Sequence, residues 1–357
     1  MKIGVHKVAM AAPSDTSELK GLIASGALDP REIVAVIGKT EGNGGANDFT
    51  RALATLSFAL ALEPHLGRAK EAIMSEIAFV WSGGTEGVLS PHATVFTRSN
   101  ASTIPPASPR LALGLAMTRD IAPDEFGTPA HVILVADAVR QALADADIKD
   151  PADVHYVQVK GPLLTPAAIA SAKAAGQALV TDDPNGSKPF ARGAMALGVA
   201  VGLGEVQAEK VTPASIARDM NLYSKVASTS AGGELTKCEI ILFGNSPSAS
   251  SDYSIGHATL KDALDASAVG AAARSANAAV EDIVTVFAKA EASTMLRGRR
   301  TTMYSDADIN YERHARAAVG AVIASVTGDP AIFLSGGTEH QCPPGEAPIA
   351  AIVRARS

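Results

Sequence analysis

Three lysines stand at the ends of apolar segments and could each serve as a base. Each closes a segment that reads as a buried β-strand: Lys39 follows 33–37 (IVAVI), Lys160 ends 154–160 (VHYVQVK) and Lys289 ends 283–289 (IVTVFAK). The lysines are 121 and 129 positions apart, which is a domain-sized period. A lysine can activate a serine hydroxyl only if burial or neighbouring cations lower its pKa. A serine and further cations beside each lysine would therefore complete a catalytic group.

Serines and arginines recur with the same period. One motif consists of a serine, then small residues, then a glutamate four positions after the serine. It occurs as SGGTE at 82–86, SAGGE at 230–234 and SGGTE at 335–339. Between each lysine and its serine, an arginine opens a small-residue helical stretch: Arg51, Arg192 and Arg316. Lysine, arginine and serine thus follow in the same order in every third of the chain.

This order predicts an α/β (α+β) fold of three isostructural βα-type repeats around a pseudo-threefold axis. Polar, proline-rich connections at 99–109 and 244–252 suggest the boundaries. We predict repeat units at 1–103, 111–248 and 253–357. Strand ends and glycine turns from each unit would meet on the axis and form one central site.

A central site of this kind favours a small, planar ligand with threefold symmetry. The glycines let backbone N–H groups come close to a ligand, because glycine has no Cβ to obstruct it. Three arginines supply rigid donor forks for three carbonyl oxygens.

Composition excludes several other classes of protein. The 357 residues are 47% hydrophobic and 19% charged, which is typical of a globular protein rather than a disordered one. A net charge of −6 opposes binding to nucleic acid or anionic membranes, and no apolar run approaches the ~20 residues of a membrane span. The N-terminal apolar run at 8–12 is too short for a signal peptide, so we expect a cytoplasmic protein. Cys238 and Cys342 are expected to be reduced thiols.

Other site types fit the sequence less well. The Gly38-Lys39-Thr40 run lacks the upstream glycine of a phosphate-binding loop, because Ile33 stands there. The histidines are scattered without the spacing of zinc ligands: His92, His257, His314 and His340. Trp81 is expected to be a packing residue.

Six motifs in order closely resemble cyanuric acid amidohydrolases, a family of ring-opening amidohydrolases that also contains barbiturases. They are VAVIGKTEGNG (34–44), SGGTEGVLSPH (82–92), VQVKGPLLTP (157–166), VFAKAEAS (286–293), RHARA (313–317) and SGGTEHQ (335–341). The resemblance covers essentially the whole chain. It implies three repeats around a central site, a homotetramer, and hydrolysis of cyanuric acid to carboxybiuret, which decarboxylates to biuret.

The resemblance also implies roles for single residues. Ser230 would be the nucleophile and Lys160 the general base, both in the middle repeat, which departs from the others by having Ala231 and Pro162. Substrate contacts would come from Arg51, Ser82, Gly83, Arg192, Ser230, Ala231, Arg316, Ser335 and Gly336. Lys39 and Lys289 would line the same cavity. Glu312 is our candidate for the contact that distinguishes cyanuric acid from barbituric acid.

No catalytic cofactor is implied, but a structural divalent cation is, either Mg²⁺ or Ca²⁺. Its ligands would be Glu291, Thr338, Gln341, Cys342, Pro343 and Glu346, with main-chain oxygens completing an oxygen-rich shell. Three alternatives to a cyanuric acid hydrolase stay open. They are a barbiturase, a non-catalytic binder of planar ureide rings, and a Ser-Lys hydrolase of linear amides.

Overall fold

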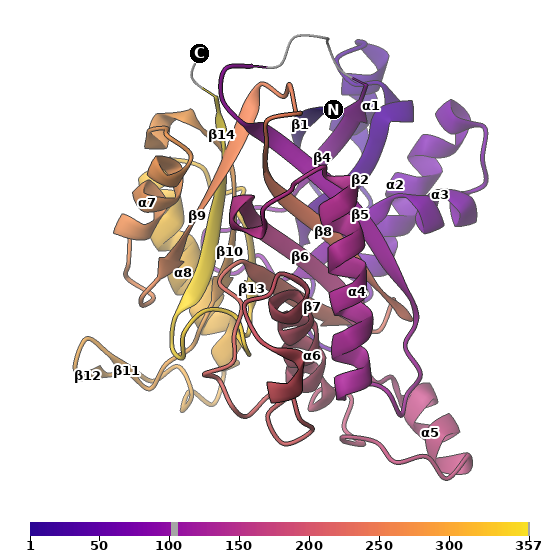
Figure 1. Cartoon of the computed structure of the whole chain (residues 1–357), viewed down its shortest axis with the longest axis vertical. Helices are drawn as coiled ribbons and strands as arrows, with labels where there is room; N and C mark the ends of the chain where they lie inside the picture. Colours follow the sequence, from indigo (N-terminus) through magenta and orange to yellow (C-terminus); the bar gives the residue numbers. More distant parts are fainter. Residues whose placement is uncertain (101–105, 356–357) are drawn as a thin grey trace.

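Three four-stranded sheets form the centre of the molecule in a computed structural model, which describes residues 1–100 and 106–355 (Figure 1). Each sheet takes its strands from one third of the chain, and helices cover its outer face.

The first unit (residues 2–99) alternates strands with helices. Its elements are β1 (Lys2–Ala9), α1 (Ser17–Ala24), a 3₁₀ turn (Pro30–Glu32), β2 (Ile33–Thr40), α2 (Thr50–Leu66), α3 (Lys70–Glu76), β3 (Ala78–Gly83) and β4 (His92–Ser99).

The second unit (residues 110–246) repeats this order with a longer insertion after its second strand. Its elements are β5 (Arg110–Asp120), α4 (Pro129–Asp145), a 3₁₀ turn (Pro151–Asp153), β6 (Val154–Pro162), α5 (Pro166–Ala174), α6 (Ser187–Gly202), a 3₁₀ turn (Ala208–Lys210), β7 (Ala227–Gly232) and β8 (Lys237–Ser246).

The third unit (residues 253–354) carries a projecting hairpin in the corresponding place (Figure 1). Its elements are β9 (Tyr253–Leu260), α7 (Ser267–Ser275), a 3₁₀ turn (Val280–Asp282), β10 (Ile283–Ala290), the hairpin strands β11 (Met295–Leu296) and β12 (Arg299–Arg300), α8 (Tyr311–Thr327), β13 (Phe333–Gly336) and β14 (Ala347–Arg354).

All three sheets have the same strand order and directions. The orders are β1-β4-β2-β3, β5-β8-β6-β7 and β9-β14-β10-β13, so the first, last, second and third strands of each unit lie side by side. Only the second and third strands run parallel, and the helix that follows the second strand makes the crossover between them. The mixed α/β class and the recurrence of one topology agree with the sequence prediction.

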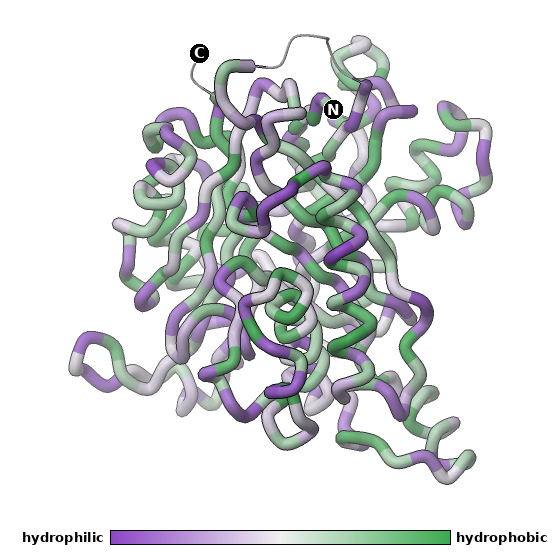
Figure 2. Tube along the Cα trace, viewed as in Figure 1, coloured by the Kyte–Doolittle hydropathy of each residue, from purple (hydrophilic) through white to green (hydrophobic). Residues whose placement is uncertain are grey.

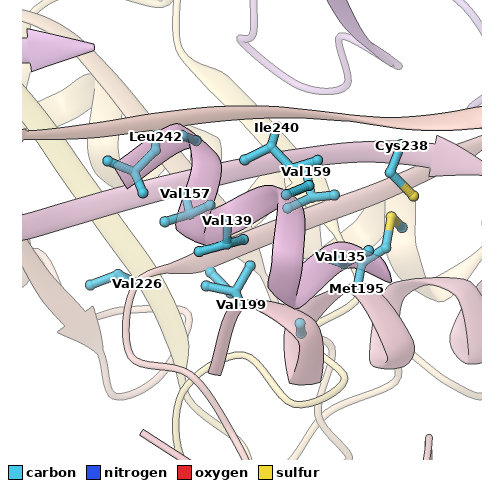
Figure 3. Close-up of a cluster of buried hydrophobic side chains, with 14 of the residues drawn as sticks. Val135, Val139, Val157, Val159, Met195, Val199, Val226, Cys238, Ile240 and Leu242 are labelled. Carbon is cyan, nitrogen blue, oxygen red and sulfur yellow. The ribbon is translucent and has the colours of Figure 1, made fainter. Parts of the chain in front are cut away.

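Successive side chains of each strand point to opposite faces of the sheet. One face packs against the helices, and the other forms part of a central core. In the second unit, the residues labelled in Figure 3 on β6 (Val157, Val159) and β8 (Cys238, Ile240, Leu242) pack against α4 and α6. Residues of the opposite parity point away from the helices and join a central core shared by all three sheets. That core includes Phe96, Tyr156, Phe243, Phe287 and Phe333. Figure 2 shows hydrophobic segments along the central strands and hydrophilic ones in the outer loops.

Each lysine lies one step beyond this central core on the same face of its strand. Lys39 follows Ile37, and Lys289 follows Phe287, each by two residues. The sheets are thus held together by apolar residues and deliver their polar strand ends to one place.

The predicted boundaries agree with the sheets only approximately. β5 begins at Arg110, one residue before the predicted start at 111. The end of the first predicted unit at 103 and the end of the third at 357 lie outside the described residues. The division into units at 1–103, 111–248 and 253–357 stays a prediction.

The three arginines lie at different depths in their helices. Arg51 is near the start of α2 as expected, but Arg192 and Arg316 are each the sixth residue of α6 and α8. Each of these two still precedes a small-residue stretch, but the helices themselves begin five residues earlier, at Ser187 and Tyr311; Asn310 caps α8 by accepting the Glu312 N–H.

The expected packing role of Trp81 is confirmed. Trp81 is 1% exposed and packs edge-to-face on Phe58 at 5.1 Å between ring centroids. Cys238 and Cys342 are both buried free thiols. No helix within residues 1–100 and 106–355 is long and apolar enough to cross a bilayer.

Candidate active site

In every sheet the lysine lies opposite the serine of its own unit. The parallel strand pairs align Lys39 with Ser82, Lys160 with Ser230 and Lys289 with Ser335. A parallel pair places residues in register at the same end of the sheet. The predicted association of each lysine with a serine is therefore a direct result of strand register.

The serines and arginines of all three units surround one small polar cavity of about 30 Å³. It is lined by Gly44, Arg51, Ser82, Gly83, Lys160, Lys188, Arg192, Ser230, Ala231, Glu312, Arg316, Ser335 and Gly336. All the residues predicted to contact substrate are in this set, as are Lys160 and Glu312. Lys39 and Lys289, which were predicted to line it, are not in this set; each is fully buried and lies behind a cavity serine, to whose hydroxyl it donates.

The buried lysines connect the units in a cycle. Each ammonium donates to the carbonyl that precedes the serine of another unit: Lys39 to Leu334 O at 2.6 Å, Lys160 to Trp81 O at 3.1 Å and Lys289 to Thr229 O at 2.7 Å. The first unit thus contacts the third, the second contacts the first, and the third contacts the second.

The arginines form a second cycle in the opposite direction. Arg51 pairs with Glu234 at 2.9 Å, Arg192 with Glu339 at 2.6 Å, and Arg316 with Glu86. Each glutamate is the one that stands four places after the serine of its unit. These bonds occupy the Nε and one terminal nitrogen of each guanidinium and fix its orientation.

Glycine is required where these arginines approach the serine turns. Gly337 has a φ of 79°, and a Cβ at this position would lie 2.4 Å from the Arg192 guanidinium. A larger residue would be strained in this left-handed conformation and would displace the arginine.

Burial lowers the pKa of all three lysines. The pKa of Lys160 falls to about 8, because burial and the nearby Arg51 outweigh the opposing effect of Glu234. The pKa values of Lys39 and Lys289 are lowered well below their usual range, mainly by burial and then by Arg316 and Arg192, respectively. Burial alone would raise the pKa of Glu234, but Lys160 and Arg51 lower it to about 2, so this carboxylate is charged.

Ser230 differs from the other two serines. Lys39 donates to Ser82 Oγ at 3.2 Å and Lys289 donates to Ser335 Oγ at 3.0 Å. The Ser230 Oγ, in contrast, is buried and has no hydrogen-bond partner among the described residues. Lys160 lies 3.2 Å from Glu234 Oε1 instead. A buried, unbonded hydroxyl at the cavity wall is available to a ligand.

A larger cavity of about 390 Å³ adjoins the central one. Both are lined by Gly44, Lys188, Arg192, Glu312 and Arg316. Lys188 and Glu312 form an ion pair at 3.1 Å, and Glu312 also accepts from Arg192 at 3.1 Å. Burial opposes ionisation of Glu312, yet Arg192, Lys188 and Arg316 lower its pKa to about 2. A charged pair therefore stands between the two cavities.

Comparison with known proteins identifies the family of this chain. The family model described as amidohydrolase ring-opening protein matches residues 4–354. The chain belongs to the ring-opening amidohydrolase family. It is 69% identical to a cyclic amide hydrolase of Azorhizobium caulinodans, over 99% of this chain and 100% of that protein. It is 49% identical to a cyanuric acid amidohydrolase of Bradyrhizobium diazoefficiens, over 99% and 98% of the two chains.

A solved structure of a cyanuric acid hydrolase, described as an evolutionary innovation by structural concatenation, superposes with a TM-score of 0.96. The two are 47% identical, and the alignment covers 99% of each chain. The chain is also 41% identical to barbiturase 1 of a Nocardioides species, over 98% of both chains. The predicted family is therefore confirmed.

The implied cation site fits this amidohydrolase only in part. Glu291, Thr338, Cys342 and Pro343 line one cavity of about 200 Å³, and the Thr338 hydroxyl donates to the Glu291 carboxylate. Burial raises the pKa of Glu291. A buried carboxylate beside a loop of main-chain carbonyls suits a hard cation.

The other predicted ligands are less suitable. The Gln341 side chain accepts from Thr229 N at 2.8 Å and donates to main-chain carbonyls, and its backbone N–H donates to Thr338 O, so only its main-chain oxygen could serve as a ligand. Burial raises the pKa of the Cys342 thiol to about 12, and a neutral thiol is a poor ligand for Mg²⁺ or Ca²⁺. Glu346 is not among the residues that line the cavity. Among the described residues, no group of three or more His, Cys, Asp or Glu side chains is placed to hold a metal ion together, so most ligands would have to be main-chain oxygens.

Sequence reasoning missed several residues of the site. It noticed Glu86, Glu234 and Glu339 as part of the serine motif but assigned them no role. Lys188 stands four places before Arg192, just as Glu312 stands four places before Arg316, and this shared spacing could have revealed it. Gly44 lines the cavity from a loop of the first unit, which no spacing indicated.

Proposed function

We propose that this amidohydrolase opens the ring of cyanuric acid by hydrolysis of one C–N bond, giving carboxybiuret, which decarboxylates to biuret and CO₂. The observation that carries the proposal is the single cavity at which three serines and three arginines from three units meet. A planar ring with three carbonyl groups matches that donor arrangement, and related chains of high identity are named for this activity. The same reasoning favours a pseudo-threefold axis through the cavity, because the lysine and arginine cycles each connect the units in turn.

The chemistry assigned to the site begins with Ser230. Its Oγ attacks a ring carbonyl carbon while Lys160, in the neutral amine form, accepts the hydroxyl proton. The carbonyl oxygen becomes an oxyanion, which arginine side chains and N–H groups of the serine turns can stabilise; one such donor is typically worth about 10² to 10³ in rate.

Collapse of this intermediate breaks the ring C–N bond. The Lys160 ammonium returns its proton to the leaving nitrogen, and the opened chain stays bound to Ser230 as an ester. Water then attacks the ester while Lys160 accepts a proton from it; as the bond to Ser230 Oγ breaks, Lys160 passes this proton to the oxygen, which restores the hydroxyl and the neutral amine and releases carboxybiuret.

The charges around Lys160 support this role. A lysine with a pKa near its ordinary value would hold its proton at neutral pH. Burial makes the amine accessible near pH 8, and the charged Glu234 stabilises the ammonium when it forms. No step requires a metal.

Barbituric acid is the second candidate substrate, and the relative named barbiturase 1 favours keeping it. Barbituric acid has CH₂ where cyanuric acid has a ring N–H, so a carboxylate at the cavity can distinguish the two. Glu312 is the carboxylate that lines the cavity.

Incubation of the purified protein with cyanuric acid, barbituric acid and a linear amide tests the proposal. Release of biuret and CO₂ from cyanuric acid supports it, and opening of barbituric acid alone indicates a barbiturase. Cleavage of the linear amide alone indicates a general amidase. Binding of a ring without any turnover would overturn the assignment of Ser230 and Lys160.

Two further parts of the proposal concern assembly and metal. We infer a homotetramer, as the family resemblance implies, and light scattering of the purified protein tests it. We also infer a structural Mg²⁺ or Ca²⁺ near Glu291 that is held by this carboxylate and by main-chain oxygens.

A further inference from the structure

A buried glutamate faces the proposed catalytic lysine across the sheet. Glu239 lies on β8, and the antiparallel pairing of β6 with β8 aligns it with Lys160. Its side chain is 3% exposed. Its neighbours Cys238 and Ile240 point toward the covering helices (Figure 3), so by alternation Glu239 points to the other face, the face of Lys160.

Only the second unit has an acid at this position. The residue aligned with Lys39 is His92. Continuing the register of β10 with β14 aligns Lys289 with Pro348. The unit that carries the proposed nucleophile is therefore also the unit in which a carboxyl group is aligned with the lysine.

Glu239 and Lys160 contact the same open strand edge of the first unit. Lys160 donates to Trp81 O at 3.1 Å, and Phe79 N donates to Glu239 Oε2 at 3.1 Å, two residues back along β3. The corresponding N–H groups of the other units are bonded within their own units. Ala227 N donates to Ser224 Oγ at 3.2 Å, and Ile332 N donates to Pro330 O at 3.0 Å.

The charges that face this pair are few. Glu239 is influenced by Lys237 on its own strand, by Lys160 on β6 and by Glu234 after β7; β5 presents Met117 opposite it. Lys160 is influenced by Glu234, Arg51 and Asp48. Burial raises the pKa of Glu239 to about 8, which is also the value to which burial lowers the pKa of Lys160. The charge of Lys160 lowers the pKa of Glu239, and such an interaction acts in both directions, so the two titrations are coupled.

We propose that Glu239 is a positioning residue that sets the protonation state of Lys160, because its buried carboxyl group is aligned with the lysine across the β6–β8 pairing and bonds to the same edge of β3. A neutral acid leaves Lys160 free to lose its proton, whereas a carboxylate would hold the ammonium in place. Glu234 thus supplies a permanent charge and Glu239 a switchable one. This inference rests on the proposed function, in which Lys160 is the general base.

The pH profile of Glu239→Gln tests the inference. Glutamine has the same shape and its amide oxygen still accepts from Phe79 N, but it cannot become negative. We expect the acid limb of kcat/KM to move to lower pH by about one unit, because no carboxylate can form opposite Lys160. His92→Gln is the matched control, since His92 faces a lysine outside the proposed reaction, and its profile should coincide with that of the wild type. A folded Glu239→Gln protein with the wild-type profile would overturn the inference.

Infrared spectroscopy tests the same pair without turnover. The wild type should show the stretch of a neutral carboxylic acid, absent from Glu239→Gln, that disappears as the pH passes about 8. Coupling is reciprocal, so in Lys160→Met the band should persist to higher pH. A band that titrates identically in both proteins, or none in the wild type at neutral pH, would overturn the inference even if Glu239→Gln does not fold. Hydrolysis of cyanuric acid by Lys160→Met would instead refute the assignment of Lys160 as the general base, on which the inference rests.

Discussion

Lys160 and Ser230 face each other in the parallel pairing of β6 with β7, yet Lys160 donates to Trp81 O and the Ser230 Oγ is unbonded. In the other two units the lysine donates a hydrogen bond to the serine hydroxyl. The second unit therefore keeps its hydroxyl free for a ligand, and catalytic hydrogen bonds often tighten only when substrate binds.

Substitution of the proposed nucleophile and base gives the first prediction. Ser230→Ala and Lys160→Ala should each lower kcat by 10²-fold or more, as expected for loss of either group. Ser82→Ala and Ser335→Ala are the matched controls and should lose less, because their hydroxyls already accept from lysines. If Ser230→Ala kept more than about a tenth of the wild-type rate, another group would be the nucleophile.

The arginine cycle gives a second prediction. Arg51→Ala, Arg192→Ala and Arg316→Ala should each weaken binding of a cyanurate-like ring by about 1.5 to 3 kcal/mol, the usual value of a charged hydrogen-bond donor. Titration calorimetry measures this. An unchanged isotherm for any one of them would show that its unit does not contact the ring.

Each arginine also contributes to the stability of the fold through its ion pair with a glutamate of another unit. Arg51→Ala leaves Glu234 without its partner, so the melting temperature should fall, and Arg51→Ala/Glu234→Gln should recover part of the loss. Additive effects in this double-mutant cycle would show that the pair does not couple the first and second units.

The third prediction concerns pH. Lys160 must be neutral to accept a proton, and its pKa is lowered to about 8. Below that value the ammonium form dominates, so kcat/KM should rise about tenfold per pH unit until it levels off near pH 8. Initial rates from pH 5.5 to 9.5 test this; an acid limb near pH 10 would mean that burial does not activate the lysine.

A fourth prediction addresses the choice of substrate. The Glu312 carboxylate can accept a hydrogen bond from a ring N–H but not from the CH₂ of barbituric acid. Glu312→Ala should therefore lower the ratio of kcat/KM for cyanuric over barbituric acid by about tenfold, the value of one hydrogen bond to a charged group. Lys188→Met, which removes the ion-pair partner and keeps the carboxylate, should preserve the ratio. Equal losses on both substrates for Glu312→Ala would assign it a structural role.

The fifth prediction is that the inferred cation stabilises the protein without taking part in the reaction. Glu291→Gln or chelation should lower the melting temperature and reduce activity only partially, and added Mg²⁺ or Ca²⁺ should restore the chelated wild type by mass action. Complete loss of activity with an unchanged melting temperature would point to a metal-activated water as nucleophile.

Much of the candidate site could be predicted because it lies at repeated positions. Lys39, Lys160 and Lys289 end strands of recognisable apolar pattern, and strand register then fixes which serine each one faces. The helix starts were less predictable, since the segments before Arg192 (SKPFA) and Arg316 (YERHA) are compatible with both a loop and a helical first turn.

By itself the sequence determined the class of fold, the three repeats of lysine, arginine and serine, and the family, because periodic strands and motifs are local properties. Contacts between units were decided only by tertiary structure. Nothing in the spacing of Arg51 and Glu234, 183 positions apart, indicates that they meet. The alignment of Glu239 with Lys160 likewise depends on the pairing of β6 with β8, and both residues then bond to the edge of β3. Burial, which shifts the pKa values of both groups, exists only after three sheets have closed around a common core.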